Sequence, residues 1–149
     1  MSDKLELSDL WPLIDEVISG GGEFRLTPNG ISMLPLIRPG IDSITLVLPN
    51  DVQKGDVVLY KRDNGQYVLH RVMYIKKEEY VMCGDNQKEL EFGITNGHIL
   101  AKLKDIFRDG SAIDTRNKKY RKYFKQQMKK GRRLKIRRIL SKIKHKIFK

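Results

Sequence analysis

The sequence has a single cysteine, Cys83, among its 149 residues. One thiol excludes an intramolecular disulfide, so this chain must fold without one and its redox compartment is not revealed by cysteine content. No apolar run approaches the roughly 18 residues that a transmembrane helix needs. Residues 1–20 carry five acidic side chains and one lysine, the opposite of the charge of a secretory signal. We therefore expect neither a transmembrane helix nor a signal peptide.

Acidic residues are absent from Arg116 to Lys149, a stretch that holds 17 of the 30 Lys and Arg residues of the chain. All 18 acidic residues precede it, together with only 13 basic ones. The body is therefore net acidic and the tail strongly cationic. We expect an anionic partner, either phospholipid or nucleic acid, to meet the tail and not the body.

The basic tail, residues 113–149, also carries apolar side chains at helical spacing: Ile136, Leu140, Ile143 and Ile147. This spacing predicts a basic amphipathic helix, and we expect residues 118–149 to bind an anionic membrane surface. Nucleic acid is the alternative partner, because phosphate contacts need only the charges and three aromatic residues could stack on bases: Tyr120, Tyr123 and Phe124. A disordered solubilising tail is the third interpretation.

Residues 1–22 are predicted to form a short amphipathic helix. Apolar side chains recur every three or four positions after Ser8, and Gly20-Gly21-Gly22 ends the pattern. We expect the apolar face, which includes Trp11, to pack on the body. A helix lying on a membrane is the alternative, which the acidic polar face disfavours.

Residues 23–112 have the pattern of a mainly β domain. Short runs of Val, Ile, Leu and Tyr are interrupted by Gly, Pro, Asn and Asp at regular intervals, as in all-β proteins. We expect strands at 24–27, 43–48, 56–61, 67–75, 79–82 and 99–107. The chain is thus interpreted as one β body with a helix at its start and a cationic helix at its end.

Three stretches of this body carry residues of a hydrolytic site. Ser32 lies between a flexible glycine and a rigid proline, His70 lies in a strand on the same face as two valines, and Asp85 lies in a Gly-Asp-Asn turn. A serine can attack a carbonyl only when a base takes its proton and the oxyanion is stabilised. Serine, histidine and aspartate fill the three roles of a catalytic triad.

Each assignment has a structural alternative. Ser32 could simply cap a turn, Asp85 could form an Asx turn, and His70 could be a buried histidine with a satisfied hydrogen bond. A Ser-Lys dyad with Lys61 or Lys76 is another alternative to the Ser-His pair, although a lysine base would have to be buried enough to lose its proton.

Four segments in this order resemble the conserved boxes of type I signal peptidases: 30–35, 54–60, 68–72 and 83–86. The resemblance runs from about Gly30 to Lys104. It implies the β-rich fold shared with the self-cleaving repressor peptidases, and endoproteolysis without a metal or cofactor. Histidine at the base position, His70, is similar to the endoplasmic-reticulum, archaeal and sporulation branch of that family.

The resemblance also implies roles for further residues. Asp85 would hold the imidazole, with Glu89 and Glu91 as candidate supporting acids. The backbone N–H of Ser32 would stabilise the oxyanion, whereas Gly30 stands where some family members add a serine hydroxyl. Apolar pockets for small substrate residues would be lined by Ile31, Met33 and Leu34, and substrates would be exported or precursor peptides.

We therefore expect a peripheral membrane serine endopeptidase, on the cytoplasmic side by default. A non-catalytic β module that binds anionic membrane or nucleic acid through its tail is the alternative. A self-cleaving peptidase of the repressor type is a third interpretation, although no DNA-reading helix pair precedes the body.

Overall fold

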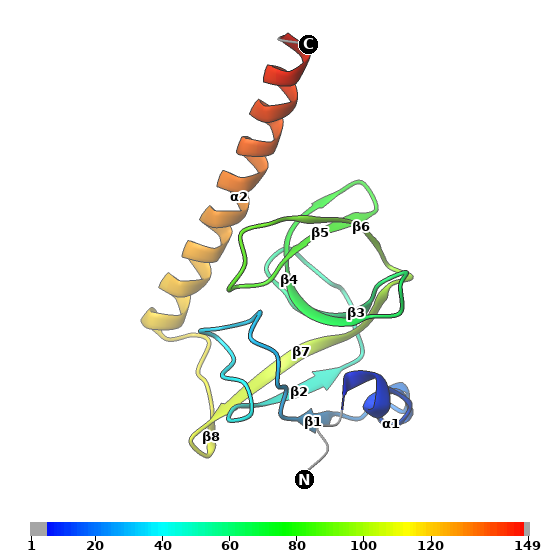
Figure 1. Cartoon of the computed structure of the whole chain (residues 1–149). Helices are drawn as coiled ribbons and strands as arrows, with labels where there is room; N and C mark the ends of the chain where they lie inside the picture. The colour runs from blue at the N-terminus through cyan, green and yellow to red at the C-terminus, as the bar shows by residue number, and fades with distance from the viewer. Residues whose placement is uncertain (1–5, 148–149) are drawn as a thin grey trace.

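The computed structural model describes residues 6–147, which form one antiparallel sheet of eight strands and two helices (Figure 1). The elements in chain order are α1 (Leu7–Ser19), β1 (Phe24–Leu26), β2 (Ser43–Val47), β3 (Val57–Lys61), β4 (Tyr67–Lys76), β5 (Glu79–Cys83), β6 (Glu91–Thr95), β7 (Ile99–Arg108), β8 (Ser111–Ala112) and α2 (Lys118–Ile147). Residues 1–5 and 148–149 of the expected terminal segments lie outside the described residues.

The sheet confirms the expectation of a mainly β body. Its strand order is β1-β2-β7-β3-β4-β5-β6, with β8 paired to β7, and every pair is antiparallel. Register shifts interrupt several of these pairs, including β3 with β7 and β4 with β5, and such bulges bend strands. The strands from β3 to β6 accordingly curl in Figure 1. Because both sides of the curled sheet are covered, most of β4 is buried on both faces.

The six expected strands are all present, but two strands were not predicted. β6 contains Gly93 and only two large apolar residues, so its sequence has a weak strand pattern. It forms because β5 offers it a free edge for hydrogen bonding. β8 is two residues long and is too short to have a pattern at all.

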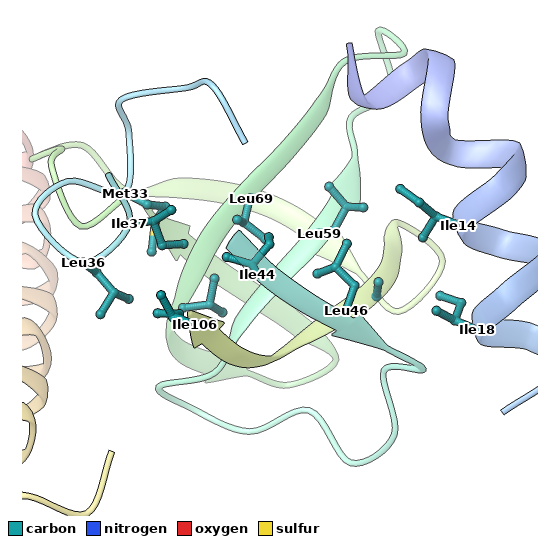
Figure 2. Close-up of a cluster of buried hydrophobic side chains, with 12 residues drawn as sticks. Ile14, Ile18, Met33, Leu36, Ile37, Ile44, Leu46, Leu59, Leu69 and Ile106 are labelled. Carbon is teal, nitrogen blue, oxygen red and sulfur yellow. The ribbon is translucent and has the colours of Figure 1, made fainter. Parts of the chain in front are cut away.

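Helix α1 packs on the body, as expected. Its first turn is capped from Glu6, whose backbone N–H donates to the Asp9 carboxylate at 3.2 Å, so the cap lies two residues before Ser8. Ile14 and Ile18 are buried against β2, β3 and β7 (Figure 2). Burial of each of these side chains contributes about 1.5–3 kcal/mol. These two residues of the apolar face are therefore covered by the body and not available to a membrane.

Helix α2 begins as part of the body and ends as a projection from it (Figure 1). The part of α2 up to Leu134 packs on β4 and buries Gln127, Met128, Gly131 and Leu134. A Cβ on Gly131 would lie 3.1 Å from the Met73 side chain, so this glycine permits the close approach. The proposal of a disordered tail is therefore wrong for residues 118–147.

The aromatic residues of the tail belong to this docked half. Tyr120 and Tyr123 pack against the main core, and Phe124 covers Gly55 so closely that a Cβ there would lie 2.4 Å from the ring. These rings pack on the body and are each only partly exposed, which leaves less of their surface for stacking on bases.

Candidate functional site

The loop that carries Ser32 connects β1 to β2 and is anchored in the core. Met33 and Ile37 are buried (Figure 2), and the Ile37 backbone N–H donates to the Met33 carbonyl at 3.0 Å. This short turn leaves the Ser32 side chain partly exposed, between two apolar residues that point in different directions. Ile31 is exposed whereas Met33 is not. The local sequence therefore holds the hydroxyl at the surface of the core.

A turn after β5, residues 84–87, supports this loop from the other side. The Asn86 backbone N–H donates to the Ser32 carbonyl at 2.9 Å, and the Asn86 side chain donates to the Ile31 carbonyl at 3.2 Å. A Cβ on Gly84 would lie 2.6 Å from the Ser32 carbonyl oxygen. Glycine is thus required where the two segments meet. The Gly-Asp-Asn sequence positions the backbone of Ser32.

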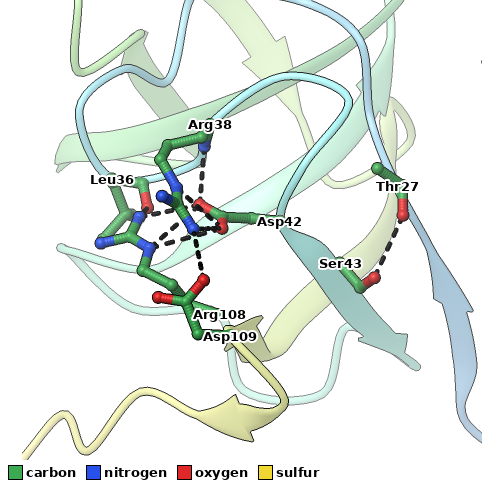
Figure 3. Close-up of polar contacts among 7 residues, drawn as sticks. All are labelled: Thr27, Leu36, Arg38, Asp42, Ser43, Arg108 and Asp109. Carbon is green, nitrogen blue, oxygen red and sulfur yellow. Dashed lines mark hydrogen bonds and ion pairs between the residues drawn. The ribbon is translucent and has the colours of Figure 1, made fainter.

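A buried carboxylate, Asp42, holds the far end of the same loop (Figure 3). It accepts hydrogen bonds from the guanidinium groups of Arg38 and Arg108, both at 2.8 Å, and Arg108 also donates to the Leu36 carbonyl at 2.8 Å. Burial alone would raise the pKa of Asp42, but the hydrogen bonds from Arg108 and Arg38 hold it well below its usual range. The Ser32 loop is consequently fixed at both ends.

Ser32 and His70 line the same cavity, which has a volume of about 530 Å³. Ser32 comes from the loop and His70 from β4, while α1 and β1 contribute Leu10 and Leu26 to the walls. No hydrogen bond joins the Ser32 hydroxyl to the imidazole among residues 6–147. Such bonds are often long before a substrate binds. The cavity is of the size that holds small ligands or a few substrate residues.

The imidazole of His70 is held by a chain of hydrogen bonds that leads to Glu91. The Tyr60 hydroxyl lies 3.1 Å from His70 Nδ1 and donates its proton to Glu91 Oε1 at 2.5 Å. Since this hydroxyl has only one proton, Nδ1 must carry the imidazole proton and donate it to the Tyr60 oxygen. The Nε2 atom then keeps its lone pair, which is the tautomer that a general base requires.

The charge of Glu91 is stabilised by Arg62. The Arg62 guanidinium donates to both Glu91 oxygens, at 2.8 and 2.9 Å. Burial alone would raise the pKa of Glu91, but the hydrogen bonds from Arg62 and Tyr60 lower it. Burial, with Coulomb repulsion from Arg62, lowers the pKa of His70 to about 4. The imidazole is therefore neutral at pH 7.

Asp85 does not take the position expected of a triad aspartate. Its carboxylate accepts two hydrogen bonds from Arg71, both at 2.8 Å, and one from the Tyr123 hydroxyl at 2.7 Å. Among the described residues no hydrogen bond joins Asp85 to His70, whose Nδ1 is held by Tyr60 instead. The expectation that Asp85 contacts the imidazole is thus corrected. Its contacts make it an anchor of the turn that supports Ser32.

Helix α2 closes the outer side of the same turn. Lys130 Nζ donates to the carbonyl oxygens of Gly84 and Asp85, both at 3.1 Å, and to that of Gln87 at 2.8 Å. Burial lowers the pKa of Lys130. The tail thus contributes Tyr123 and Lys130 to the support of the Ser32 loop, which the division into body and tail did not predict.

Of the other residues predicted for the site, some line the cavity and others lie outside it. Gly30, Ile31 and Met33 line the cavity, whereas Leu34 lies outside that lining. Glu89 is exposed and lines an adjoining cavity that shares His70 and Arg62 with the first. A Cβ on Gly30 would meet no atom within 4 Å, so a serine hydroxyl would fit there.

The backbone N–H of Ser32 is available as a donor, and two lysines can be set aside as the base. The Ser32 backbone N–H donates to no other group in residues 6–147, which leaves it free for an oxyanion. Lys61 and Lys76 are both exposed, so neither has the burial that a neutral lysine base needs.

Tyr60, Arg62 and Arg71 were not predicted as site residues. A tyrosine or an arginine in a strand has no distinctive spacing, and only the pairing of β3 with β4 brings Tyr60 to His70.

Two further absences concern the described part of the chain. Residues 6–147 contain no cluster of three or more His, Cys, Asp and Glu side chains that could hold a metal ion. Neither of their two helices combines the length and apolar character needed to cross a bilayer.

Comparison of the chain with protein-family models, with curated proteins and with solved structures gives no match.

Proposed function

We propose that the chain is a serine endopeptidase with the fold and the Ser-His chemistry of type I signal peptidases. The observation that carries the proposal is a hydroxyl and a neutral imidazole that line the same cavity, Ser32 and His70, with the imidazole held by Tyr60 in the tautomer that a base requires. Cleavage after small residues of exported or precursor peptides follows from the family resemblance alone.

The proposed reaction uses the residues as follows. Nε2 of His70 takes the proton of the Ser32 hydroxyl as Oγ attacks the scissile carbonyl carbon, and the backbone N–H of Ser32 donates to the oxyanion. The imidazolium then returns the proton to the leaving amine. Water hydrolyses the resulting ester with His70 again as the base. Glu91 stabilises the imidazolium through Tyr60.

A non-catalytic binding module is the second candidate. The observation in its favour is the pKa of His70 near 4, because such an imidazole is a weak base at pH 7. The deciding experiment is incubation of the full chain with a peptide library that contains small-x-small sites, with products identified by mass spectrometry. Cleavage by the parent that is absent with Ser32→Ala supports the peptidase. Absence of cleavage by the folded parent supports the binding module.

The Tyr60→Phe substitution is expected to lower kcat by about 10²-fold with little change in KM, since it disconnects the imidazole from Glu91 and frees Nδ1 to change tautomer. Steady-state kinetics on the best library peptide measure the effect. Tyr80→Phe is the matched control, because its hydroxyl donates to Asn96 away from the cavity. Equal kcat values for the two variants would show that Tyr60 has no role in the mechanism.

The pH dependence of kcat/KM is expected to show one acidic limb with a midpoint near pH 4. Catalysis needs neutral His70, so activity rises with pH through the pKa of about 4 and is constant above it. An unperturbed histidine would give a midpoint near 6.5. Initial rates between pH 3.5 and 8 at low substrate concentration measure the limb, and a midpoint at 6.5 or higher would contradict the buried imidazole.

A further inference from the structure

Helix α2 has two faces that serve different purposes. The face that packs on the body includes Leu134, and farther along it Arg138 stacks on the Phe92 ring with 3.9 Å from Cζ to the ring centroid. At 100° per residue, Ile143 lies about 180° around the helix from Leu134, and Ile136 and Leu140 each lie about 160° from Arg138. The apolar side chains of the second half therefore face away from the body.

We name this outer surface of α2 the outer face. Five aliphatic residues form its second half, and each is about half exposed or more: Ile136, Ile139, Leu140, Ile143 and Ile147. Five exposed cations continue it toward the start of the helix, all within about 40° of Ile136: Lys118, Lys122, Lys125, Lys129 and Arg132. The outer face is thus one stripe, cationic where the helix begins and apolar where it projects.

The charge around the apolar half has a single sign. Arg137 and Lys144 border the aliphatic residues on one side, and Lys142 and Lys146 border them on the other. Helix α2 contains no Asp or Glu along its 30 residues. A surface that covers this stripe must therefore offer negative charge beside an apolar phase.

We propose that the outer face of α2 docks on an anionic membrane surface, with the helix lying in the interface. The acyl boundary receives the five aliphatic side chains, and the headgroups receive the flanking lysines and arginines. The apolar half is about 18 Å long at 1.5 Å per residue, so it suits a helix lying on a bilayer better than one crossing it.

Two other occupants fit the outer face less well. Nucleic acid would neutralise the cations but would leave five aliphatic side chains in water. A second copy would bury those side chains but would place one acid-free cationic helix beside another. The docked aromatic residues also favour lipid over nucleic acid, since the body holds Tyr123 and Phe124 and limits their stacking on bases.

The experiment measures binding of the full chain to phosphatidylcholine vesicles with 30 % phosphatidylglycerol, and to pure phosphatidylcholine vesicles, by co-sedimentation. The parent is expected to bind the anionic vesicles and to be released by 0.5 M NaCl. The double variant Leu140→Gln and Ile143→Gln is expected to bind at least tenfold more weakly. Its matched control is Ile41→Gln with Ile75→Gln, which changes two exposed isoleucines of the body and should stay within twofold of the parent.

Several results would overturn the proposal. One is equal vesicle binding by the parent and the α2 double variant, and another is equal binding to the two vesicle types. Tighter binding to duplex DNA or single-stranded RNA at the same ionic strength would assign the outer face to nucleic acid. A dimer in sedimentation velocity that the double variant loses would assign it to a second copy. Vesicle binding by Ser32→Ala should equal that of the parent, so this test is independent of peptidase activity.

Discussion

The Ser32→Ala substitution is expected to lower kcat by at least about 10³-fold while leaving the fold intact. The hydroxyl donates no hydrogen bond to His70 among residues 6–147, and the side chain is partly exposed, so its removal opens no cavity. The contacts that hold this residue are made by its backbone carbonyl, which Asn86 still reaches in the variant. Loss of activity would therefore report chemistry and not unfolding.

His70→Ala should cause a loss of activity of the same order, and the double variant should lose little more, because the nucleophile and the base act as one unit. Single-turnover kinetics with the best library peptide measure all three proteins, and urea unfolding checks their stability. If Ser32→Ala retained a tenth or more of the parent rate, another group would be the nucleophile. A copurified protease would then also have to be excluded by purifying the variant again.

The Arg71→Met substitution is expected to lower the free energy of unfolding by about 3–5 kcal/mol. Arg71 and Asp85 form a buried pair whose side chains are 1 % and 0 % exposed. Removal of the guanidinium leaves the Asp85 carboxylate buried with Tyr123 as its main partner, and also leaves the Gly55 carbonyl without its donor. A buried carboxylate without a countercharge costs much more than a hydrogen bond contributes.

Chemical denaturation by urea measures this loss, with Lys104→Met as the matched control. Lys104 pairs with Glu23 where both side chains are about half exposed, so solvent screens the pair and its removal should change the stability little. The double variant Arg71→Met with Asp85→Leu should recover part of the stability, because it removes the unpaired charge. A cost below 1 kcal/mol for Arg71→Met alone would show that water or another cation replaces the guanidinium.

This ion pair connects stability to the candidate site. Asp85 belongs to the turn that holds Ser32, and the same turn receives Tyr123 and Lys130 from α2. The Ser32 loop is thus supported by a strand, a turn and the helix that also carries the outer face. A substitution that undocks α2 should reduce activity through this turn even though it lies far along the sequence from Ser32.

The strands that could be predicted are those with an apolar pattern of their own. Tyr67 to Ile75 is rich in Val, Leu, Met, Ile and Tyr and forms β4, whereas β6 depends on the free edge of β5 and has a weak pattern. The helical spacing of the tail likewise predicted α2. It did not predict that the start of α2 would dock, because the docking face mixes Met128 and Leu134 with Gly131 and Gln127 and so has no continuous apolar stripe.

Periodicity and composition predicted the mainly β body, the two helices and the separation of charge between body and tail from the sequence, because these signals act over short stretches of chain. The sequence also singled out Ser32 and His70, which line one cavity. The partner of each acidic side chain could be seen only in the folded structure. The pairing of β3 with β4 brings Tyr60 to His70 and Tyr60 donates to Glu91, whereas the buried Arg71 and the partly buried Tyr123 donate to Asp85. A buried carboxylate must accept hydrogen bonds from whichever donors the fold brings to it, and those donors are distant in sequence.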